Sequence, residues 1–149
     1  MTIRVERVLP AARGRLVTVG QECQLTEAAR LLSASSRQMV IVCDGSGIMV
    51  GVVTRTDIVR QIQHCRGCAC TTACATIMTT DVVSCRPEDR LRDIWSTMKD
   101  RGLQNVPIVH SDGRPVGLLS AADAMQALLS EVEYEEELLK GYVMCVGYR

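Results

Sequence analysis

Apolar positions follow the same order of patterns in both halves of the chain. Residues 25–32 and 91–98 each place apolar side chains at positions i, i+3, i+4 and i+7, which is one face of an amphipathic helix. Each predicted helix precedes two short apolar runs separated by an Asp-Gly turn, and such runs are typical of buried strands. These runs are residues 40–42, 50–53, 107–109 and 116–119. With short strands that end near residues 18–19 and 84–85, we predict the same order twice: strand, helix, strand, turn, strand, helix.

A sequence repeat supports this prediction. Val-Gly-Val-Val-Thr-Arg-Thr-Asp at residues 50–57 recurs 66 positions later as Val-Gly-Leu-Leu-Ser-Ala-Ala-Asp at residues 116–123. The helix faces align at the same offset, whereas the strands at residues 40–42 and 107–109 align once the first turn is allowed one extra residue. A small module that cannot close a core alone must stack on its copy. The sequence therefore predicts an α/β (α+β) protein made of two packed modules.

The modules are expected at residues 5–63 and 75–131, with a cysteine-rich segment at residues 64–74 between them. Residues 132–149 form a tail that begins as an acidic continuation of the last helix. Gly141 is expected to end that helix, because glycine is favoured just past a helix C-terminus. The remaining apolar, β-prone residues are expected to pack on their own module or on a partner subunit.

Composition narrows the function classes. Lysine plus arginine equals aspartate plus glutamate at 17 each, so no net charge recruits nucleic acid or an acidic membrane. The chain has no phenylalanine and a single tryptophan, which argues against a stacking platform for single-stranded nucleic acid. No apolar run approaches the ~20 residues that a bilayer span needs, and the N-terminus does not have the pattern of a signal peptide. We therefore expect a cytoplasmic protein without a membrane or nucleic-acid partner.

The repeated Thr54-x-x-Asp57 and Ser120-x-x-Asp123 motifs each follow an apolar strand and open a helix. One interpretation is a capping box, in which the hydroxyl and the acid satisfy the amides at the helix start. The other is nucleotide binding, in which the hydroxyl and free amides hold a phosphate while the aspartate accepts hydrogen bonds from a ribose. The motif alone favours the capping box. In both helices the expected inward positions are Ile58 and Ile62, or Ala124 and Leu128.

The complete ordered pattern, with its Val-Pro-Ile-Val strand and its Gly-apolar-apolar-Thr/Ser-x-x-Asp motif, resembles the cystathionine β-synthase (CBS) domain family. The resemblance covers residues 5–131 and both copies carry it. It implies a pseudo-twofold pair of modules, commonly assembled into a homodimer, that binds adenosine compounds such as AMP, ATP, NAD or S-adenosylmethionine. It also implies a regulatory role toward a partner protein that the sequence does not identify.

Within this resemblance, the ribose-binding acid falls on Asp57 and Asp123, and the phosphate-binding hydroxyl falls on Thr54 and Ser120. The residues implied near the adenine are Thr18, Met39, Val40, Ser84, Val106, Pro107 and Ile108. The first copy has Met39-Val40 where the family usually has a proline, and it has Arg55 where the second copy has Ala121. Arg55 is a candidate for a terminal phosphate or a solvated helix-start residue. The second copy is therefore favoured for adenine and ribose contacts.

The cysteine-rich segment offers five soft ligands: His64, Cys65, Cys68, Cys70 and Cys74. Their density suits a Zn²⁺ site or an iron–sulfur cluster, although the spacing matches no zinc-finger pattern closely. A reversible redox pair and unligated thiols are the alternatives. Cys23, Cys43 and Cys85 read as small buried hydrophobic residues, and Cys145 is ambiguous.

Three function classes follow. The sequence favours a regulatory adenine-nucleotide-binding module, because both copies carry the motif. The alternative is a redox or metal sensor that uses residues 65–74. An enzyme is disfavoured, because neither histidine lies in a recognisable nucleophile or acid–base motif.

Overall fold

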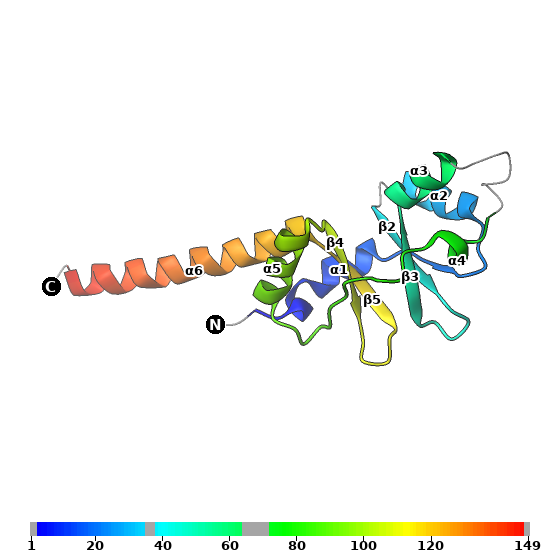
Figure 1. The fold of residues 1–149 in the computed structure, drawn as a ribbon. Coiled ribbons are helices and arrows are strands. Elements are labelled where there is room, and N and C mark those ends of the chain that lie inside the picture. The colour runs from blue at the N-terminus through cyan, green and yellow to red at the C-terminus, as the bar shows by residue number, and fades with distance from the viewer. Residues whose placement is uncertain (1–2, 35–37, 64–71, 148–149) are drawn as a thin grey trace.

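The computed structural model describes residues 3–34, 38–63 and 72–147, with the side chains of the last helix described as far as Leu139. Two small α/β units lie side by side, and one long helix projects from the second unit (Figure 1). The elements in chain order are η1 (Val5–Val8), α1 (Leu9–Arg15), β1 (Thr18–Gly20), α2 (Leu25–Ala34), β2 (Met39–Cys43), β3 (Met49–Thr54), α3 (Arg55–Gln63), α4 (Cys74–Ile77), α5 (Leu91–Arg101), β4 (Asn105–Val109), β5 (Pro115–Ser120) and α6 (Ala121–Gly147).

The first module is a three-stranded sheet in the order β1-β2-β3, with β1 parallel and β3 antiparallel to β2. The apolar face of α2 buries Leu25, Ala28 and Leu32 against the sheet, as its periodicity predicts. In the second module, the β4–β5 hairpin packs on α5, which buries Leu91 and Met98. The mixed helix and strand class and the two-module organisation are confirmed.

The strand expected at residues 84–85 is reduced to one parallel bridge, between Cys85 and Ile108. In the first module, the amides of Gln21 and Ile41 donate the hydrogen bonds that flank the equivalent pairing, at 3.0 and 2.9 Å. The residues 66 positions later are Pro87 and Pro107, which carry no amide hydrogen. The ladder therefore cannot extend in either direction from Cys85.

The strand register corrects the sequence alignment of the two copies. Met39 pairs with Thr54, and Asn105 pairs with Ser120, so the strands are equivalent at an offset of 66 like the rest of the repeat. The two turns also match, because both contain a glycine with positive φ at the same place, 84° at Gly47 and 90° at Gly113. The expected extra residue in the first turn is wrong.

The core of each module includes side chains from a segment that lies, in the chain, just before the other module. The N-terminal segment η1–α1 packs Val5, Val8 and Ala12 into the core of the second module. The α4 segment packs Cys74 into the core of the first, and Thr79 forms a bridge with Val52 on β3. The boundaries expected from the sequence therefore assign residues 5–15 to the first module, whereas the structure packs this segment on the second module.

Two glycines allow these segments to approach the sheets. A Cβ on Gly117 of β5 would lie 2.9 Å from the Cβ of Ala12 on α1. A Cβ on Gly51 of β3 would lie 2.7 Å from the sulfur of Met78 and 2.8 Å from the carbonyl oxygen of Thr79. Both distances are shorter than real Cβ contacts, so each strand needs glycine at this position.

A third apolar cluster joins the two sheets. Its buried members are Ile41, Cys43 and Val52 from the first module and Leu118 from the second. Leu16, which directly follows α1, packs against this cluster. The two modules therefore share a core, and the chain between α1 and β1 runs through it.

The last helix runs much further than the sequence predicts. α6 continues to Gly147, so the expected helix end at Gly141 and the β-prone tail are wrong. A single glycine in a helix interior costs only about 1 kcal/mol, and its neighbours at residues 138–140 are good helix formers. No described helix is both long enough and apolar enough to cross a membrane.

The inward positions of the two motif helices differ. Ile58 packs in the first core, and Ala124 and Leu128 pack in the second, as expected. Ile62 is 61% exposed, so its prediction as an inward residue is wrong. Ile62 is the next-to-last residue of α3, whereas α6 continues well past the equivalent Leu128, which packs in the second core.

Candidate functional site

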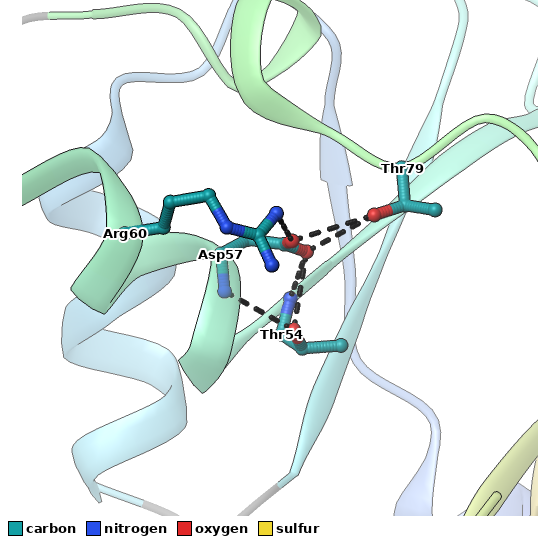
Figure 2. A network of polar contacts seen from close by, with 4 residues as sticks. All are labelled: Thr54, Asp57, Arg60 and Thr79. Atoms are coloured by element: carbon teal, nitrogen blue, oxygen red, sulfur yellow. Dashed lines mark hydrogen bonds and ion pairs between the residues drawn. The ribbon is translucent and has the colours of Figure 1, made fainter.

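The Thr54-x-x-Asp57 motif forms a closed polar network where β3 meets α3 (Figure 2). The amide and hydroxyl of Thr54 donate to Asp57 Oδ2 at 3.0 and 3.1 Å, and the amide of Asp57 donates to Thr54 Oγ1 at 3.3 Å. The Thr79 hydroxyl lies 3.4 Å from both carboxylate oxygens, and Arg60 Nη1 lies 3.7 Å from Oδ1. The geometry is a capping box with added partners from α3 and the α4 segment.

The equivalent motif in the second module is only half of a capping box. The amide of Asp123 donates to Ser120 Oγ at 3.1 Å. The carboxylate of Asp123 instead receives a fork of two hydrogen bonds from Arg15 on α1, from Nε at 2.9 Å and from Nη2 at 3.2 Å. This bidentate geometry is the strongest arrangement of a guanidinium with a carboxylate.

The two aspartates therefore have different surroundings. The Asp57 side chain is 7% exposed, whereas that of Asp123 is 20% exposed. Asp123 also lies on the wall of a cavity of about 850 Å³ between the N-terminal segment and α6. Most of this wall is apolar, with Ile3, Val8 and Ala127 among its members.

The strands that were expected to flank an adenine contribute little side-chain surface. Val40, Val106 and Ile108 have no exposed surface, and Pro107 is also buried in the core. Met39 is half-buried and packs against the cluster between the sheets. The cavity beside Asp123 is thus built from η1, α1 and α6 rather than from these strands.

The remaining predicted residues lie apart from Asp123. Thr18 is exposed on β1, and Ser84 lines a separate, smaller cavity of about 360 Å³ with His110. Arg55 Nη2 donates to the carbonyl oxygen of Leu32 on α2 at 3.2 Å. This bond ties the start of α3 to the end of α2.

Three residues at these sites were missed by sequence reasoning: Arg15, Thr79 and Asn105. The one-residue alignment error hid Asn105, whose register places it opposite Ser120. The sequence repeat gave no signal for the other two, because residues 12–15 (Ala-Arg-Gly-Arg) and residues 78–81 (Met-Thr-Thr-Asp) share no residue. The structure nevertheless places these two segments at equivalent positions, against Gly117 and Gly51.

Three of the described cysteines, Cys43, Cys74 and Cys85, are core thiols. Cys74 has no exposed surface, and burial raises its pKa to about 11. Burial likewise raises the pKa of Cys85 to about 12, and it also raises the pKa of Cys43. Burial therefore favours the protonated form of these thiols.

His64, Cys65, Cys68 and Cys70 lie outside the described residues. Within the described residues, no group of three or more potential ligands is placed to hold a metal ion. Cys23 is half-buried rather than buried, so its expected burial is only partly met, whereas Cys43 and Cys85 are buried as expected.

Curated relatives share part of this chain. It is 27% identical over 114 residues to a homoserine O-acetyltransferase of Methanohalophilus mahii, covering 76% of this chain but 22% of that protein. It is 25% identical over 123 residues to an uncharacterized 17.7 kDa protein of Acidianus ambivalens, covering 83% of this chain and 73% of that protein. The shared region is therefore a small part of the first relative.

Solved structures share the fold. The CBS-domain-containing protein ATU1752 from Agrobacterium tumefaciens has a TM-score of 0.72 and 26% identity, over 85% of this chain and 94% of that chain. The CBS domain pair of protein MJ0100, solved with 5'-methylthioadenosine and S-adenosyl-L-methionine, has a TM-score of 0.73 and 19% identity over 88% and 99%. CBSX2, solved with AMP, has a TM-score of 0.74 and 21% identity over 85% and 96%.

The family model of the CBS domain matches twice, at residues 6–64 and 74–130. These two matches coincide with the two repeats and cover most of the chain. The protein belongs to the CBS domain family, as a tandem pair.

Proposed function

We propose that this protein is a regulatory module that binds an adenosine-containing ligand, such as AMP, ATP, NAD or S-adenosylmethionine, and passes a conformational signal to a partner protein. The observation that carries the proposal is the position of Asp123, a partly exposed carboxylate on the wall of an apolar cavity of about 850 Å³. A carboxylate can accept hydrogen bonds from both hydroxyls of a ribose, and an apolar wall suits a purine face. Similar CBS pairs bound to AMP, 5'-methylthioadenosine and S-adenosylmethionine support the ligand class.

We assign the primary site to the second module. The Asp57 carboxylate is already engaged by Thr54, Thr79 and Arg60, so a ribose would have to displace internal partners of a buried group. The Asp123 carboxylate is engaged by Arg15, a half-exposed arginine that moves at lower cost. Ser120 accepts one hydrogen bond and keeps a hydroxyl hydrogen that it can donate to a phosphate.

A regulatory pair of this kind is expected to work as a homodimer. Val59 on α3 and Met125 on α6 occupy equivalent positions, and both are large apolar side chains with 58% and 49% of their surface exposed. Exposed apolar residues at matching positions of the two modules favour contact with a second chain.

Isothermal titration with AMP, ATP, NAD, S-adenosylmethionine and adenosine tests the proposal, on protein first stripped of carried-over ligand. We expect binding to at least one of them. A ligand at 100 times its dissociation constant should also raise the free energy of unfolding by about 2.7 kcal/mol. The absence of both binding and stabilisation for all five compounds would remove the proposal.

Substitution separates the two motifs. Asp123→Asn should weaken binding by about tenfold or more, because it removes the charged acceptor for the ribose hydroxyls. Asp57→Asn should instead lower the free energy of unfolding, by about 1–2 kcal/mol, and leave affinity at the second module unchanged. Asp100→Asn, at an exposed position on α5, is the matched control and should change neither. Equal loss of affinity in both motif variants would contradict the assignment to the second module.

A further inference from the structure

Arg15 brings a positive charge from the N-terminal segment onto the second module. It is the last residue of α1, and its guanidinium forks onto both carboxylate oxygens of Asp123 across 108 positions of sequence. The Arg15 side chain is 42% exposed and that of Asp123 is 20% exposed. Asp123 lines the cavity described above, so a ligand in that cavity can reach its carboxylate.

The helix that carries Arg15 is held firmly on the second module. Ala12 is buried against β5, where Gly117 provides the room for it. Arg15 lies one helical turn beyond Ala12, so the guanidinium reaches Asp123 from a fixed base. The packing of α1 on β5 therefore fixes the backbone position from which Arg15 reaches Asp123.

The residues immediately after Arg15 belong to the first module. Leu16 packs in the cluster between the two sheets, and the amide of Ile41 on β2 donates to the carbonyl oxygen of Val17 at 2.9 Å. Only two residues then separate Arg15 from β1. A change at Arg15 therefore reaches the sheet of the first module through a short, hydrogen-bonded stretch of backbone.

We propose that Arg15 is a latch on the second module: it competes with the ligand for Asp123, and its release transmits occupancy of that site to the first module. This inference rests on the proposed function, because it takes the ligand to be adenosine-containing. Both oxygens of Asp123 that would receive the ribose hydroxyls face the guanidinium fork in the structure. Binding then has to replace an internal ion pair, which lowers the observed affinity by the strength of that pair.

The expected size of this effect follows from the exposure of the pair. A bidentate pair at a partly exposed position lies at the upper end of the surface range, which corresponds to about a threefold to fivefold change in an equilibrium constant. Removing the charge at residue 15 should raise the affinity for adenosine by that factor. Uncharged adenosine is the appropriate probe, because its own binding has no charge that salt can screen.

The test compares adenosine titrations of the wild-type chain, Arg15→Gln, Arg15→Lys and Arg13→Gln, at about 0.05 and 0.5 M NaCl. Salt weakens an exposed ion pair, so wild-type affinity should rise with salt and approach that of Arg15→Gln, whose affinity should not change. Arg15→Lys keeps the charge without the fork and should lie between them. Arg13→Gln removes an exposed arginine from the same helix and should match the wild-type chain.

Amide exchange measured by mass spectrometry over residues 38–43 provides the second readout. Ligand-free Arg15→Gln should show exchange in β2 that the wild-type chain shows only with adenosine bound. If the wild-type chain binds adenosine while Arg15→Gln binds it equally or more weakly, the latch is refuted and the proposed function stands. Exchange in β2 that is unaffected by adenosine and by the substitution would refute the transmission step. If neither protein binds adenosine, the latch is refuted, whereas the proposed function fails only when AMP, ATP, NAD and S-adenosylmethionine also neither bind nor stabilise the protein.

Discussion

The packing of α1 on the second module can be tested at Gly117, where strand β5 meets the helix. A methyl group added there would lie 2.9 Å from the Cβ of Ala12, 3.0 Å from its carbonyl carbon and 3.2 Å from its carbonyl oxygen. Two of these three atoms are backbone, so a side-chain rotation cannot relieve the contact. Gly117→Ala therefore has to move the helix away from the strand by several tenths of an ångström.

Overpacking of this kind costs about 1–3 kcal/mol of folding free energy. For a chain of about 150 residues, a loss of 2 kcal/mol lowers Tm by about 4–8 °C. Because α1 carries Arg15, the same displacement should also loosen the contact with Asp123 and raise adenosine affinity. Urea unfolding, thermal unfolding and adenosine titration of one variant measure these effects together.

Two further variants test whether the effect of Gly117→Ala comes from its contact with Ala12. Gly14→Ala lies on the same helix at an exposed position with no atom within 4 Å, and it should stabilise the protein by about 0.5–1 kcal/mol because alanine is the better helix former. Ala12→Gly combined with Gly117→Ala should recover only part of the lost stability, since the backbone contacts remain. If Gly117→Ala costs nothing, α1 does not pack on β5 as described.

Two more predictions follow from the structure. Because the pKa of the Cys85 thiol is raised, the folded state keeps a proton that the unfolded state releases above about pH 9. The contribution of this thiol to stability is therefore complete below pH 9 and is lost as the pH rises toward about 12. The free energy of unfolding should fall less steeply between pH 9 and 10.5 in Cys85→Ala than in the wild-type chain, and parallel slopes would contradict the burial of this thiol. Met125→Glu should shift sedimentation toward a monomer if the matching apolar positions at Val59 and Met125 form a dimer contact, whereas a wild-type chain that is already monomeric would refute that contact.

Sequence periodicity was sufficient for the elements whose burial is local. The faces of α2 and α5 follow from residues three and four apart, and the structure buries Leu25, Leu32, Leu91 and Met98 as predicted. The length of the strand at Cys85 was overestimated, because Pro87 and Pro107 lack the amide hydrogens that a longer strand pairing needs. Proline removes a donor without changing the apolar pattern, so a periodicity argument does not detect the loss.

The candidate site was only partly predictable, for a different physical reason. The motif identified Asp57 and Asp123 as equivalent, and their backbone hydrogen bonds are the same. The amide of each aspartate donates to the hydroxyl oxygen of the Thr or Ser three positions earlier. What separates the two carboxylates is the segment that each receives from elsewhere in the chain. Thr79 and Arg15 are 22 and 108 positions from their aspartates, and no local pattern links them.

This exchange of segments explains how duplicated modules can acquire different roles with little change in their motifs. The Thr79 hydroxyl, from the α4 segment, completes a buried network around Asp57, and this network favours a structural role for the Asp57 carboxylate. A guanidinium from α1 neutralises Asp123 at the edge of a cavity, which leaves that carboxylate exchangeable. The donor segment of the Asp123 site runs directly into the first module, because Arg15 lies three positions before Thr18, the first residue of β1. Under the function proposed above, divergence in the two covering segments leaves one copy as a capped helix start and makes the other a ligand site.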